Sequence, residues 1–323
     1  MNAHLKRRAM LAVALGAVLP ASAWSAGYPE RPITLVVPYA AGAAVDRAGR
    51  SLAQQLEKRL GQPVVVENVA GGSGTLGARR ALRSPADGYT VVLGTINDLV
   101  IAPSVIKPGY TLQDFTPLAK TGLDTTVLVA HPSFPANSAD EVVKLARGAA
   151  APLQIGVPGN ATMQTFAATL LADAGGFKVQ HIVYKAGSPL VTDLLGAQVQ
   201  VGTIALSSVL PLIRQGKLKG LGVLSSRRHA SAPEIPSVNE GQLLKGVQAD
   251  LWTGLLAPGK LPPEVLARLA AAIEDTMRDP AFKESELRAG FMVPDFEDAD
   301  SFRKFIVHEQ TRLKLVIANV KVE

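Results

Sequence analysis

The chain has 323 residues, of which 47% are hydrophobic and 19% charged, with a formal net charge of +6 and no cysteine. The lack of cysteine excludes disulfides, thiolate metal ligands and a cysteine nucleophile. Basic residues are scattered and aromatic residues are few, so nucleic-acid binding has no support. A length near 300 residues favours two domains over a single core.

The N-terminus has the pattern of a secretory signal peptide. Residues 6–8 are Lys-Arg-Arg, residues 9–19 form an uncharged apolar run, and residues 20–23 are Pro-Ala-Ser-Ala. The apolar run is too short for a membrane span, which needs about 20 residues. Cleavage after Ala23 and cleavage after Ala26 both fit, as do the general and the twin-arginine export routes. Losing the three basic residues would lower the net charge from +6 to +3, and we expect a soluble periplasmic protein.

Strands and helices alternate after this segment. Short β-branched runs at 33–37, 64–67 and 90–93 are predicted strands. A helix is predicted at 46–60, where leucines recur every four residues, and a glycine-rich turn at 70–74 leads into a second short helix. This βαβαβ order predicts a parallel sheet with helices on both faces.

A second α/β series begins near Thr125. The predicted strands are 126–130, 153–157, 179–183, 199–204 and 218–224, with helices at 139–147, 162–174, 189–195 and 209–215. A strand at 251–257 leads out of this series into three predicted helices at 262–278, 280–289 and 297–320.

The segment Gly72-Ser73-Gly74-Thr75-Leu76-Gly77 fits the dinucleotide pattern G-x-G-x-x-G. That pattern requires an acidic residue at the end of the next strand, but this strand ends in Leu93-Gly94-Thr95. An exported protein also meets little NAD. We therefore interpret the glycines as a tight turn before a helix and expect no cofactor.

No catalytic or metal-binding motif is complete. His308-Glu309 opens a zinc-protease pattern, but the second histidine is replaced by Arg312. The other histidines after the signal, at 131, 181 and 229, are far apart, and none lies beside a nucleophile elbow. A catalytic triad that converges only in space is left open, and the sequence predicts neither an enzyme nor a metal site.

Three loops that follow strands are rich in small and hydroxyl residues. They are the segment 38–46, the pair Gly94-Thr95 and the segment 159–162. Ligands of open α/β sheets bind beyond the carboxyl ends of strands, and helix N-termini favour anions there. The alternative for the first loop is a plain connection in which Asp46 is the N-cap of the helix.

Several longer segments resemble one family, the TctC receptors of tripartite tricarboxylate transporters, also called Bug proteins. The residues that carry the resemblance extend over the chain after the signal: Tyr28–Ile33, Pro38–Asp46, Leu60–Asn68 (LGQPVVVEN), Asp87–Thr90, Leu93–Thr95, Val183–Lys185, Asp193–Gly196, Gly216–Leu218, Ile235–Val238 and Gly254–Pro258.

The resemblance implies a type II-like periplasmic binding fold of two α/β lobes, each a mixed, mainly parallel sheet flanked by helices. Lobe 1 would comprise residues 27–124 and 251–323, and lobe 2 residues 125–250, after a signal at 1–26. A monomer of this kind binds a small carboxylate between the lobes and serves membrane permease subunits or a sensor kinase. The resemblance implies no catalysis and no cofactor. The alternative to a binding protein is a periplasmic hydrolase.

The resemblance also implies ligand-binding positions. They are Tyr39, Ala40, Ala41, Gly42, Ala43, Ala44, Asp46, Gly94, Thr95, Asn97, Gly159, Asn160, Thr162, Tyr184, Ala205 and Ser207.

This sequence departs from the family pattern at four positions. Ala43 and Ala44 replace consecutive glycines, Thr165 replaces a frequent histidine, and Gly202 replaces a usual aspartate. The alanine methyls would narrow the first loop. The other two replacements lead us to expect a roomier or less charged wall in lobe 2.

Overall fold

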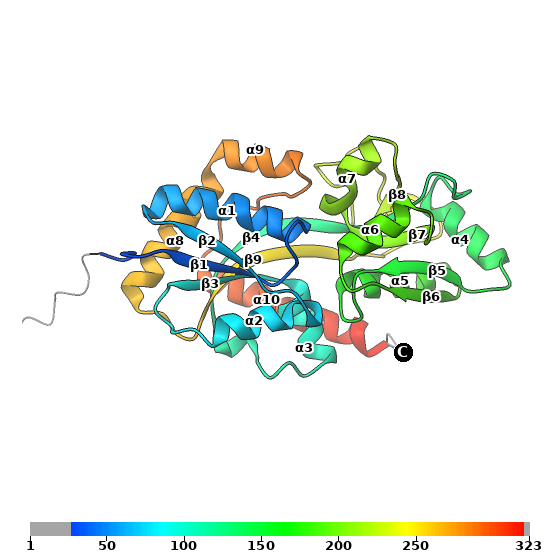
Figure 1. Ribbon diagram of the computed structural model, residues 1–323. Helices are drawn as coiled ribbons and strands as arrows, with labels where there is room; N and C mark the ends of the chain where they lie inside the picture. Colours follow the sequence, from blue (N-terminus) through cyan, green and yellow to red (C-terminus); the bar gives the residue numbers. More distant parts are fainter. Residues whose placement is uncertain (1–26, 320–323) are drawn as a thin grey trace, which may run out of the picture.

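The computed structural model describes residues 27–319, so the predicted signal peptide and its cleavage positions lie outside the described residues. Two α/β lobes lie side by side, and two long strands, β4 (Phe115–Ala130) and β9 (Asp250–Pro258), run between them (Figure 1). Within residues 27–319, no helix is both long and apolar enough to cross a membrane.

The sheet of lobe 1 is built as the alternating elements predict. Strand β1 (Ile33–Val37) pairs in parallel with β2 (Val64–Asn68) and β3 (Thr90–Thr95), and β9 joins β3 in antiparallel orientation. Alternate β1 residues face opposite sides, so its two faces belong to different cores.

Helices cover both faces of this sheet. One core includes residues of α1 (Ala44–Leu60), α8 (Pro263–Arg278) and α9 (Pro280–Arg288). The opposite core includes residues of α2 (Thr75–Leu82) and α10 (Ala299–Asn319). The C-terminal helices thus complete the lobe that the N-terminal strands begin (Figure 1).

In lobe 2, β5 (Leu153–Val157) pairs in parallel with β6 (Val179–Val183) and β7 (Val201–Ala205), while β7 and β8 (Lys219–Val223) run antiparallel to β4. The helices of this lobe are α4 (Ala139–Gly148), α5 (Met163–Gly175), α6 (Gly187–Leu195) and α7 (Leu206–Arg214).

Strand β4 is much longer than the expected 126–130. Its residues 115–125 pair with β9, and from Thr126 onward it pairs with β7. The order β2-β1-β3-β9-β4-β7-β5-β6, with β8 also on β4, makes one nine-stranded sheet through both lobes. Buried polar residues such as Lys120 and Thr121 concealed the first half of β4 from a hydrophobic pattern. The change of partner at Thr126 lies beside the lobe boundary that we propose.

Short helical turns complete the chain. They are η1 (Gly72–Gly74), the π-helical η2 (Asn97–Ile101), α3 (Ala102–Val105), η3 (Leu112–Asp114) and η4 (Val238–Glu240). The strands at 33–37, 153–157 and 179–183 have the predicted bounds, whereas α1, α6 and α7 each begin earlier than predicted. The two to three added residues place these N-termini at the cavity described next.

Candidate functional site

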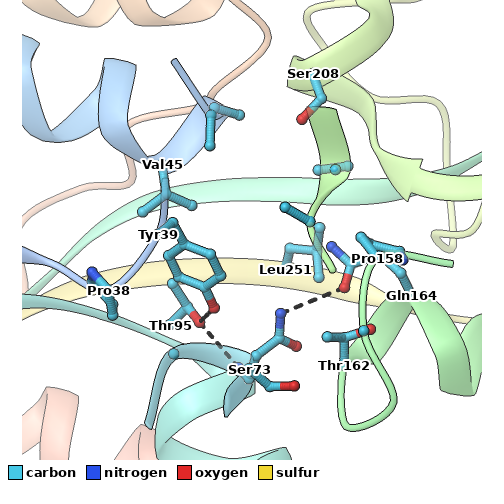
Figure 2. A pocket seen from close by; sticks show the side chains of 18 of the residues that line it. Pro38, Tyr39, Val45, Ser73, Thr95, Pro158, Thr162, Gln164, Ser208 and Leu251 are labelled. Carbon is cyan, nitrogen blue, oxygen red and sulfur yellow. Dashed lines mark hydrogen bonds between the residues drawn. The ribbon is translucent and has the colours of Figure 1, made fainter. Parts of the chain in front are cut away.

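A cavity of about 1000 Å³, including the part open to solvent, lies between the lobes. Figure 2 shows Tyr39 and Val45 on the side of lobe 1, facing Thr162, Gln164 and Ser208 of lobe 2. Loops that follow six strands line it: β1, β2, β3, β5, β6 and β7. The carboxyl ends of strands from both lobes therefore converge on one space, as in other open α/β sheets that bind ligands.

Three of the helices that begin at this cavity have an alanine as the N-cap residue. Ala43, Ala186 and Ala205 are the N-cap residues of α1, α6 and α7, and none has an oxygen to accept from the first turn. By contrast, α4 and α9 are capped by the side chains of Ser138 and Asp279. The cap residues of α1, α6 and α7 all line the cavity, so positive helix ends face it. In α7 the Ser207 N–H donates to Asp124 Oδ1 at 3.4 Å.

Asp46 stabilises the conformation of the loop that follows β1 and is not the N-cap of α1. Asp46 is the third residue of α1, and its carboxylate accepts from Gly42 N (2.8 Å), Asn68 Nδ2 (2.8 Å) and Arg50 Nε (3.1 Å). Burial alone would raise its pKa, but these hydrogen bonds outweigh burial and lower the pKa. The alternative in which Asp46 is the N-cap is therefore wrong, because the N-cap of α1 is Ala43.

A buried network supports the lobe 1 wall. The Tyr39 hydroxyl lies 2.8 Å from Thr95 Oγ1, and Thr95 donates from its N–H (3.0 Å) and its hydroxyl (2.6 Å) to Asp98 Oδ1. Asp98 is fully buried, and burial raises its pKa to about 7 against the lowering effect of the Thr95 hydrogen bonds. Burial likewise raises the pKa of Tyr39. Tyr39 and Thr95 therefore present neutral hydroxyl groups at the cavity.

Asn97 connects the two lobes across the cavity. Its Oδ1 accepts from the N–H of Met163, the first residue of α5, at 2.8 Å, and its Nδ2 lies 3.5 Å from Gln164 Oε1 (Figure 2). The N-cap of α5 is Thr162, which accepts from Thr165 N at 3.3 Å. The N-terminus of α5 is thus occupied by protein groups.

The structure brings part of the expected ligand-binding set to the cavity wall. These residues are Tyr39, Ala40, Ala43, Ala44, Thr95, Asn97, Gly159, Thr162 and Ala205.

The other expected residues do not line the cavity, for local reasons. Ala41, Gly42 and Asn160 are exposed to solvent on their loops. Gly94 is buried within β3, where a Cβ would lie 2.7 Å from Leu99 Cδ1.

Asp46, Tyr184 and Ser207 also lie off the wall, because each is turned toward another protein group. Asp46 holds the first loop, the Tyr184 hydroxyl donates to Asp193 Oδ2 (2.8 Å), and the Ser207 hydroxyl donates to Asp124 Oδ2 (2.5 Å).

Two of the departures from the family pattern do not alter the wall as expected. Thr165 is buried, and its hydroxyl donates to the carbonyl of Gly159. Gly202 pairs with Val129 inside the sheet, where a Cβ would lie 3.2 Å from Leu194 Cδ1. Neither residue lines the cavity, so the expected roomier wall does not arise at these positions.

Other wall residues had not been expected. The loop after β2 contributes Ala70, Gly71, Ser73 and Gly74, and the loop after β6 contributes Lys185, Ala186 and Gly187. Both follow strand ends, a signal that could have identified them. Pro38 and Val45 belong to the segment 38–46 that the sequence singled out. No local signal marks the remaining ones: Ile96, Asp124, Pro158, Gln164, Ile204, Ser208, Leu251, Trp252, Thr253 and Phe291.

The glycine pattern at 72–77 has a steric explanation. Gly72 and Gly74 have φ values of 57° and 94°, which favour glycine. A Cβ on Gly77 would lie 2.6 Å from the Cα of Pro38, so α2 packs directly on the start of the first loop. The turn therefore shapes the cavity wall.

Among the described residues, no group of three or more His, Asp or Glu side chains is placed to hold a metal. Glu309 of the incomplete zinc pattern is buried and accepts from Arg312 at 2.7 and 2.9 Å.

The chain is similar over most of its length to one receptor family. The family model TctC, tripartite tricarboxylate transporter family receptor, matches residues 48–322. The protein BugT of Bordetella pertussis is 31% identical over 290 residues, covering 88% of each chain.

Solved structures show the same two-lobed fold. The periplasmic binding protein BugD has a TM-score of 0.85 at 29% identity, covering 92% of this chain and 99% of that one. MatC of Rhodopseudomonas palustris, solved with malate, has a TM-score of 0.82 at 27% identity and covers 90% and 99%. Rpa4515 of R. palustris, solved with adipate, has a TM-score of 0.83 at 25% identity and covers 90% and 97%.

Proposed function

The chain belongs to the TctC family of tripartite tricarboxylate transporter receptors, and we propose that it captures a small organic acid in the interlobe cavity and delivers it to a membrane permease. Its relatives include periplasmic binding proteins, and related structures hold malate and adipate. We place the protein in the periplasm as a monomer, after removal of the predicted signal peptide, and assign it no catalytic activity.

The observation that carries the proposal is the set of uncapped helices at the cavity. Ala43 and Ala186 offer no side-chain acceptor to the first-turn N–H groups of α1 and α6, and both residues line the cavity. A carboxylate can accept from such groups and is favoured by the helix dipoles without an arginine. The Thr95 hydroxyl donates to Asp98 and lies 2.8 Å from the Tyr39 hydroxyl, so these two residues form a neutral part of the lobe 1 wall that does not repel the acid.

In this proposal, closure of the lobes around the ligand tells the permease that the protein is loaded. The Asn97–Met163 hydrogen bond joins the lobes beside the ligand space. A ligand that contacts both walls would favour this arrangement over an open one, and a permease could recognise the closed shape.

Titration calorimetry of the purified protein against succinate, malate, aspartate, adipate and citrate tests the proposal. We expect saturable binding of at least one acid. Heat from amines or sugars alone, with none from any carboxylate, would contradict it. The matched variant Ala186→Asp places a carboxylate at the N-terminus of α6, and should weaken acid binding at least tenfold because the N–H groups gain an internal acceptor.

Location is tested separately by cell fractionation. The full-length chain should be found in the periplasmic fraction, and a chain starting at residue 27 should stay in the cytoplasm. Periplasmic recovery of the shortened chain would contradict the predicted signal.

A further inference from the structure

Asp124 is a buried acid at the wall of the ligand cavity. It lies on β4 opposite Leu251 of β9, and paired residues of an antiparallel ladder have side chains on the same face. Leu251 points into the cavity in Figure 2. Asp124 is 5% exposed and lines the same cavity. Asp124 and Leu251 also line a second cavity, which contains Lys120.

The hydrogen bonds of Asp124 leave part of its accepting capacity unused. Oδ1 accepts from Thr125 N at 2.7 Å and from Ser207 N at 3.4 Å, and Oδ2 accepts from the Ser207 hydroxyl at 2.5 Å. Each carboxylate oxygen can accept two hydrogen bonds. Oδ2 therefore retains one position for a further donor.

No cation neutralises this acid in the part of the chain that the structure describes. The charge of Arg47 lowers the pKa of Asp124 slightly, but its guanidinium lies 3.6 Å from Glu286 and donates to the carbonyl of Ala289 at 3.1 Å. Burial raises the pKa of Asp124 to about 7, and the hydrogen bonds from Ser207 and Thr125 only partly offset that effect. A buried acid without an ionic partner is costly, and such groups concentrate at functional sites.

We propose that Asp124 selects the ligand class: it accepts a hydrogen bond from a hydroxyl or ammonium group that the ligand carries beside its carboxylate. The inference rests on the proposed function and sharpens it. The helix N-termini bind the carboxylate of the ligand, and Asp124 accepts a hydrogen bond from its hydroxyl or ammonium group. An acid without a donor leaves Asp124 unpaired, and a second carboxylate placed beside Asp124 is repelled.

Three acids of equal chain length test this selection by calorimetry. Succinate, malate and aspartate carry hydrogen, hydroxyl and ammonium at the same carbon. We expect malate or aspartate to bind at least about tenfold more tightly than succinate, which corresponds to one added hydrogen bond to a charged group. The order of malate and aspartate distinguishes a hydroxyl from an ammonium donor.

The variant Asp124→Asn assigns the preference to this residue. It keeps the shape and removes the charge, so malate and aspartate should fall to within about threefold of succinate while succinate binding is retained. The control Asp98→Asn changes another buried acid that supports the wall without lining it. It should affect all three acids alike and preserve their order.

The outcomes separate the two proposals. If no carboxylate binds the wild-type protein, the proposed function is wrong. If succinate binds as tightly as malate and aspartate, or if adipate binds and none of the three does, only the selection by Asp124 is wrong. An equal loss for all three acids in Asp124→Asn would also overturn it, and the wild-type order decides the matter should that variant fail to fold.

Discussion

Asp46 provides a test of whether the first loop is shaped from behind the cavity wall. The change is Asp46→Ala, which removes the acceptor of Gly42 N–H and of the Asn68 amide, each at 2.8 Å. Hydrogen bonds to a charged group contribute about 1.5–3 kcal/mol each. The Arg50 pair adds little, because the Arg50 side chain is 54% exposed.

We expect Asp46→Ala to lower the free energy of unfolding by about 2–3 kcal/mol, because Gly42 and Asn68 are partly accessible and regain hydrogen bonds with water. This corresponds to a fall in Tm of roughly 3–5 °C for a chain of this length. Ligand affinity should also fall about tenfold, through disorder of the loop that carries Tyr39 and Ala43. Asp46→Asn keeps one acceptor and should lose about half as much stability.

Thermal unfolding and calorimetry on the same samples provide both readouts. The control is Glu284→Ala, which breaks an exposed pair with Arg288 and should cost less than about 0.5 kcal/mol. The Asp46 contribution is fully present above the unfolded pKa of about 3.9 and is lost as pH falls through the lower folded pKa. A melting temperature equal to the wild type at pH 7, or lost binding with unchanged stability, would refute the positioning role.

Three further predictions concern packing, titration and closure. Gly77→Ala should destabilise by at least about 2 kcal/mol in thermal unfolding, because its Cβ would lie 2.6 Å from the Cα of Pro38, and wild-type stability would contradict that packing. The folded pKa of Asp98, about 7, exceeds its unfolded value, so the free energy of unfolding should decrease as pH rises from about 4 to about 7. Urea unfolding at several pH values should show a weaker pH dependence in Asp98→Asn, and an unchanged dependence argues against a raised pKa. Asn97→Ala should weaken ligand binding about fivefold and expand the ligand-free protein in small-angle scattering, through loss of the hydrogen bond from Met163; unchanged values would remove it as an interlobe contact.

Local pattern was sufficient for most elements of the fold. Strand 33–37 and its neighbours follow β-branched runs, and glycine or proline ends the helices between them. Local pattern was insufficient for the first half of β4, whose polar residues Lys120 and Thr121 are buried and which pairs with β9. Since β9 lies far along the chain, no local window of sequence contains the reason for that strand.

The candidate site was also predictable only in part from the sequence. The sequence alone determined that small-residue loops follow the strands and that they match one receptor family. Only the tertiary structure decided which side chains of those loops face the cavity. Asp46 and Tyr184 turn away because nearby donors or acceptors satisfy them, while Asp124 and Phe291 reach the wall from a strand and a loop with no recognisable motif. A ligand site between two lobes depends on how distant segments close around it, and that closure is a long-range property of the fold.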